Sequence, residues 1–73
     1  MTSIEKEALK KWIKQEQDNN QAFYSENIRE YWGDFILSRV ESKEVTTLKQ
    51  AKFLGYALWV FYGNAIYIKN HEA

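Results

Sequence analysis

The sequence has no cysteine and no proline, only three glycines and a single histidine. The absence of cysteine excludes disulfide frameworks and thiolate metal sites. The absence of proline and the shortage of glycine favour uninterrupted helices over a turn-rich β fold. An excess of either charge is also missing, because ten Lys and Arg balance ten Asp and Glu. A nucleic-acid partner is therefore disfavoured, since domains that bind nucleic acid are usually basic.

Long apolar runs are missing as well. No stretch of about 18 apolar residues occurs, so we expect no membrane-spanning segment. The N-terminal residues are too polar for a signal peptide, which makes the cytoplasm the expected location. The 73 residues, 45% hydrophobic and 27% charged, predict one globular domain over residues 1–73.

The residue types needed for catalysis are scarce. The one histidine, His71, stands two residues from the C-terminus, so a Ser–His or Cys–His arrangement is not available. The glycines Gly33, Gly55 and Gly63 stand alone and form no phosphate-binding loop. No Glu-x-x-His pattern of the di-metal bundle type is present. We therefore expect no enzyme activity, no metal and no cofactor.

Two amphipathic helices are predicted in the first 42 residues. The first covers residues 3–17, with Thr2 just before it and Glu5 in its first turn at the spacing of a capping box. Residues 26–42 follow Ser25, a plausible N-cap. In each segment the large apolar side chains recur at helical spacing and gather on one face.

The remaining segment, residues 46–70, has two interpretations. As a helix it is capped by Thr46 or Thr47, and Gly63 costs it only about 1 kcal/mol relative to alanine. As a hairpin it turns at Gly63, with aromatic and β-branched residues on both sides. The hairpin leaves both of its faces apolar, so we favour the helix. The predicted fold class is an all-α, small three-helix bundle with the third helix central; the alternative is two to three helices plus a C-terminal β-hairpin at residues 58–69.

Aromatic residues are unusually frequent, at 16% of the chain. Each aromatic hides roughly 150–250 Å² when buried, so twelve of them exceed what one small core can cover. We expect the surplus to form an interface and the chain to be a homodimer. The expected surface is a stripe at helical spacing on the third helix, the aromatic–lysine stripe, which consists of Lys49, Lys52, Tyr56, Trp59 and Tyr67.

A second candidate surface is an acidic row on the second predicted helix. Glu26, Glu30 and Asp34 repeat every four residues, with Leu37 as an apolar foothold among them. Five acids against one base give residues 16–34 a local charge of −4. Such a row can attract a basic partner and speed the encounter.

These observations predict a non-catalytic protein-binding module that acts as an inhibitor or adaptor of a larger protein or complex. Its partner is another protein whose identity the residues do not indicate. Chains this small are often encoded by phages or other mobile elements, although no residue points to that origin. The alternative is a small nucleic-acid-associated transcriptional regulator, with a recognition helix at 48–56 and a wing-like ribbon at 58–69.

Overall fold

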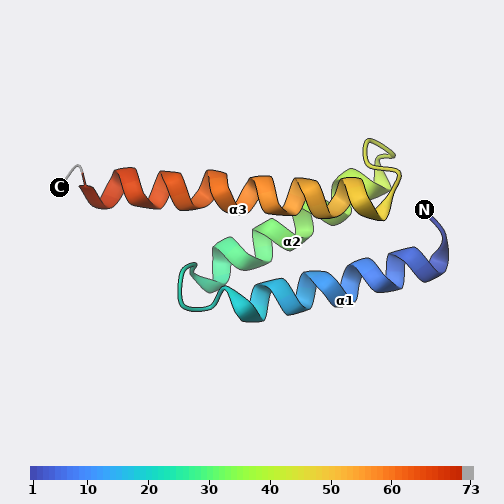
Figure 1. Ribbon diagram of the computed structural model, residues 1–73, viewed down its shortest axis with the longest axis horizontal. Helices are drawn as coiled ribbons and strands as arrows, with labels where there is room; N and C mark the ends of the chain where they lie inside the picture. Colours follow the sequence, from blue (N-terminus) through green and yellow to red (C-terminus); the bar gives the residue numbers. More distant parts are fainter. Residues whose placement is uncertain (72–73) are drawn as a thin grey trace.

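The fold is an up-down-up bundle of three helices, seen in a computed structural model that describes the backbone of residues 1–71 and the side chains of residues 1–63. The helices are α1 (Ser3–Asn19), α2 (Glu26–Glu41) and α3 (Leu48–His71), and each contacts the other two (Figure 1). The prediction of an all-α three-helix bundle is confirmed, and residues 1–71 contain no strand.

Side-chain caps set where the helices begin. The hydroxyl of Thr2 accepts a hydrogen bond from the backbone N–H of Glu5 at 3.1 Å, and the Glu5 carboxylate accepts one from the N–H of Thr2 at 3.2 Å. This reciprocal capping box holds the pKa of Glu5 below its ordinary value, because the bond from the Thr2 amide stabilises the carboxylate. Ser25 caps α2 and Thr47 caps α3 through their hydroxyl oxygens. The N-caps expected for the first two helices are confirmed.

The C-terminal segment is one continuous helix. α3 passes through Gly63 without a break, so the hairpin alternative at residues 58–69 is not adopted. The nucleic-acid alternative places a recognition helix at 48–56 and a ribbon at 58–69, and both ranges belong to α3. The C-terminal end of α3 extends past the turn between α1 and α2 (Figure 1). Each helix contacts the other two, and Phe53, Val60 and Phe61 leave one face of α3 exposed, so α3 is not enclosed as a central helix.

Three tryptophans, one from each helix, meet in the core. Trp32 of α2 is fully buried, and its ring stacks on that of Trp59 of α3 with centroids 4.1 Å apart and planes 13° from parallel. Trp12 of α1 packs against Trp32 at a centroid distance of 5.5 Å. The Trp32 indole Nε1 donates a 2.8 Å hydrogen bond to the backbone oxygen of Gly55. The buried hydrophobic residues are Leu9, Ile13, Trp32, Ile36, Ala51 and Trp59.

The tryptophan rings leave no room for a side chain at Gly55. A Cβ atom placed there would lie 2.6 Å from Cη2 of Trp12 and 2.9 Å from Cζ2 of Trp32. Gly33 of α2 is buried too, but the atom nearest to its added Cβ is Nε2 of Gln17, the far end of a flexible side chain, at 2.6 Å, followed by Cγ2 of Ile13 at 3.0 Å. A side chain at Gly55 would have to displace two rigid indole rings, whereas one at Gly33 would mainly displace the end of the Gln17 side chain.

We expect Gly55→Ala to lower the free energy of unfolding by about 1–2 kcal/mol, because overpacking against two rigid rings outweighs the gain in helix propensity. Gly33→Ala is the matched control. It should change stability by less than about 0.5 kcal/mol, since the gain in helix propensity offsets the loss of the 2.8 Å hydrogen bond that Gln17 Nε2 donates to the backbone oxygen of Arg29. Urea unfolding followed by circular dichroism measures both, and equal stabilities for the two variants would contradict the close approach at Gly55.

Candidate functional site

The outer face of α3, the side directed away from α1 and α2, is an exposed apolar surface. Phe53 is 76% exposed, Val60 62% and Phe61 66%. Val60 and Phe61 follow Phe53 by seven and eight residues, about two helical turns, so all three lie on one side of the helix. Tyr56 stands at the edge of this side, half exposed, and Ala57 lies between the larger side chains. The outer face of α3 is hereafter defined by Phe53, Tyr56, Ala57, Val60 and Phe61.

The aromatic–lysine stripe does not form this surface. Trp59, at its centre, is only 7% exposed, which corrects the expectation that its ring is available to a partner. The ring is held between Trp32 and Tyr24, at centroid distances of 4.1 Å and 4.7 Å. The exposed side of α3 is turned by about 90° around the helix axis from the predicted stripe.

The other members of the stripe are distributed differently. Tyr56 packs edge-on against Trp12, with centroids 5.4 Å apart, and keeps half of its surface exposed. Lys49 is exposed, whereas Lys52 is partly buried with its Nζ 5.9 Å from the centroid of the Trp12 ring. Tyr67 lies outside the residues whose side chains are described. Of the predicted stripe, Tyr56 alone belongs to the outer face of α3.

The sizes of the residues on α3 are the signal from which its buried side could have been predicted. Ala51 and Gly55, four residues apart, lie on the buried side of the helix. Small residues at this spacing allow a helix to approach bulky groups closely, and three tryptophans need such a neighbour. Hydrophobicity alone favours burying Phe53 and Phe61 ahead of a glycine, so a polarity pattern assigns the wrong side.

The acidic row is exposed along α2. Glu26, Glu30 and Asp34 lie in water, and among the side chains described none of the three forms an ion pair. The three carboxylates are therefore accessible, and their role in attracting a partner stays a prediction. Leu37 is not its foothold, because the leucine is half buried and packs against the core.

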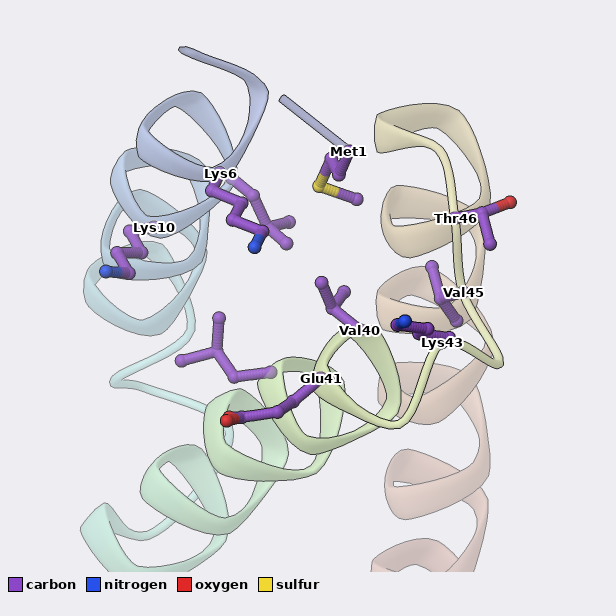
Figure 2. Close-up of a pocket in the computed structure, with 10 residues that line it drawn as sticks. Met1, Lys6, Lys10, Val40, Glu41, Lys43, Val45 and Thr46 are labelled. Atoms are coloured by element: carbon purple, nitrogen blue, oxygen red, sulfur yellow. The ribbon is translucent and has the colours of Figure 1, made fainter. Parts of the chain in front are cut away.

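Leu37 instead lines a cleft of about 580 Å³ between α1, the end of α2 and the loop at residues 42–47. Figure 2 shows Lys6 reaching toward this gap, with Met1 and Val40 on opposite sides of it. The lining mixes apolar side chains with lysines and one carboxylate. The cleft lies at the end of the bundle that holds Met1 and the loop between α2 and α3.

The described side chains offer contact surface and no cluster of ligating groups. Among them no group of three or more His, Cys, Asp or Glu is placed to hold a metal ion. No helix, over the residues described, has the length and apolarity needed to cross a bilayer. Four of the seven large hydrophobic side chains that stand exposed among the described residues belong to the outer face of α3, and burying such apolar surface is favourable by about 25 cal/mol per Å².

Comparison with known proteins finds no matching family model, no matching curated protein and no matching solved structure.

Tyr24 links the loop between α1 and α2 to the middle of α3. Its hydroxyl donates a 2.6 Å hydrogen bond to the backbone oxygen of Trp59, and its ring stacks on the Trp59 indole. Burial raises the pKa of the Tyr24 hydroxyl above its ordinary value, since the charged form is poorly solvated there. Its neighbour Phe23 is 72% exposed, so only Tyr24 of this aromatic pair packs against the core.

We expect Tyr24→Phe to lower the free energy of unfolding by about 1 kcal/mol at pH 7, through loss of the bond to Trp59. Because the folded state raises the Tyr24 pKa, the unfolded chain releases this proton first as the pH rises. The Tyr24 hydroxyl therefore contributes its full stabilisation below about pH 10, the ordinary pKa of tyrosine in an unfolded chain. This contribution falls as the pH rises above that value. The difference between wild type and variant should shrink between pH 7 and about pH 11 in parallel thermal melts. A constant difference would contradict the raised pKa.

Proposed function

We propose that this chain is a non-catalytic protein-binding module, an inhibitor or adaptor of a larger protein, and that it binds through the outer face of α3. The observation that supports this is the exposure of Phe53, Val60 and Phe61 in a domain whose core cluster does not include them. Three tryptophans already fill the centre of the bundle. We therefore infer that Phe53, Val60 and Phe61 serve an intermolecular contact, since they do not pack in the core.

The size of the patch supports the same proposal. At the exposures observed, its three aromatic side chains and Val60 present roughly 400–500 Å² of mainly apolar surface. Patches of about 300–600 Å² are the largest on a typical monomer and are often functional. Phenylalanine and tyrosine are also among the residue types enriched in protein interfaces. A patch of this size and composition suits a protein partner.

The charge pattern narrows the kind of partner. α3 carries lysines and no acidic residue from Leu48 to His71. Lys49 is exposed at the N-terminal end of the helix, beside the apolar face. A matching surface is therefore apolar at its centre, and an acidic residue at its edge would strengthen the association. A larger protein with such a surface is the partner we propose, and a second copy of this chain, which offers the same apolar centre without the acidic edge, competes with it.

The double variant Phe53→Glu/Phe61→Glu tests the proposal. We expect it to fold normally, because both residues are exposed, and to lose at least about tenfold in the recovery of bound protein, because charged side chains replace the apolar contact. The measurement is affinity capture from cell lysate with quantitative mass spectrometry, and circular dichroism checks the fold.

The matched control is Ile4→Glu/Phe23→Glu, which adds the same two charges at positions 83% and 72% exposed but outside α3. The control should recover the same proteins as the wild type. If the α3 variant recovers them equally well, the outer face of α3 is not the binding surface and the proposal is wrong.

A further inference from the structure

The two phenylalanines of the outer face of α3 are placed symmetrically about Ala57, whereas Tyr56 and Val60 have no symmetric counterparts on this face. Phe53 precedes this alanine by four residues and Phe61 follows it by four, so each phenylalanine lies about 6 Å from it along the helix axis. Ala57 is exposed and presents only a methyl group between the two rings. A small residue flanked by two equally spaced large ones allows a second helix to cross closely at the alanine.

We propose that a second copy of the chain covers this face, with the two α3 helices antiparallel and the two-fold axis passing beside Ala57. Phe53 of one copy then packs against Phe61 of the other, and the same contact repeats across the axis. The proposal rests on the proposed function, because it names the occupant of that same surface. A two-fold interface requires one patch to be complementary to itself, and the equal spacing about Ala57 meets that requirement.

The distribution of charge favours identical copies in this orientation. Residues 53–61 contain no charged side chain, so two identical faces meet without repulsion. Lys49 precedes Ala57 by eight residues. In an antiparallel pair the two copies of Lys49 are about 24 Å apart along the axis, whereas a parallel pair places them side by side. Repulsion between lysines therefore disfavours the parallel arrangement.

The available area is adequate for such a dimer. Two copies of the face contribute roughly 800–1,000 Å² of mainly apolar surface from the side chains described. Neighbouring residues at the rim add to this, which brings the total close to the lower limit of about 1,200 Å² for stable interfaces. We therefore expect a reversible dimer that dissociates on dilution.

Cross-linking through a single cysteine tests the position of the axis. The chain has no cysteine of its own, so Ala57→Cys introduces the only thiol. At the proposed crossing the two thiols are close enough to form a disulfide under mild oxidation. We expect Ala57→Cys to cross-link at least about tenfold faster than Ala8→Cys, an exposed control on α1. Equal rates would overturn the proposed axis.

Charge exchange tests the antiparallel pairing. In Phe53→Lys/Phe61→Glu, each lysine of an antiparallel dimer faces a glutamate, so association should survive. In Phe53→Lys/Phe61→Lys and in Phe53→Glu/Phe61→Glu, like charges meet, and we expect association to weaken at least about tenfold relative to the mixed variant. Sedimentation equilibrium over a range of concentrations measures all three. Equal weakening in all three variants would overturn the antiparallel arrangement.

The wild-type result separates this proposal from the proposed function. A wild-type chain that is monomeric at every concentration overturns the dimer. If Phe53→Glu/Phe61→Glu still loses its captured protein in that case, the outer face binds a different protein and the proposed function stands. If the wild type dimerises and the same variant captures other proteins normally, the dimer stands and the proposed function fails.

Discussion

The contact between Trp32 and α3 is the interaction on which the rest of the structure depends. The indole ring of Trp32 needs a flat, apolar neighbour on its face and an acceptor for its N–H group. Trp59 provides the first by parallel stacking, and the backbone oxygen of Gly55 provides the second. The oxygen is accessible because Gly55 has no side chain, which lets α3 approach the rings of Trp12 and Trp32 directly. A larger residue at this position would hold the helix away.

This contact also determines which side of α3 remains in water. Once Gly55 and Trp59 face Trp32, the geometry of a straight helix directs Phe53 and Val60 to the opposite side. Two short amphipathic helices cannot cover both sides of α3. The exposed apolar face is therefore a consequence of how the core is packed, and both proposed interactions, with a larger protein and with a second copy, make use of it.

Local features of the chain could be predicted because they depend on neighbouring residues alone. Thr2 with Glu5 and Ser25 are caps that act within one turn, and their helices begin where the residue types indicate. The exposed acidic row on α2 follows from spacing in the same way. The rotation of α3 could not be obtained from such rules, because most of its circumference is apolar and a hydrophobic pattern then gives no single buried side.

The sequence by itself determined where the first two helices begin, favoured a third helix over a hairpin, and predicted more aromatic surface than one small core covers. The tertiary structure alone decided which aromatics are surplus: Trp59 is buried, while Phe53 and Phe61 are exposed. The physical reason is steric. Burial on α3 follows the close fit of small residues to tryptophan rings from the other two helices, and that fit depends on side chains far apart in the chain.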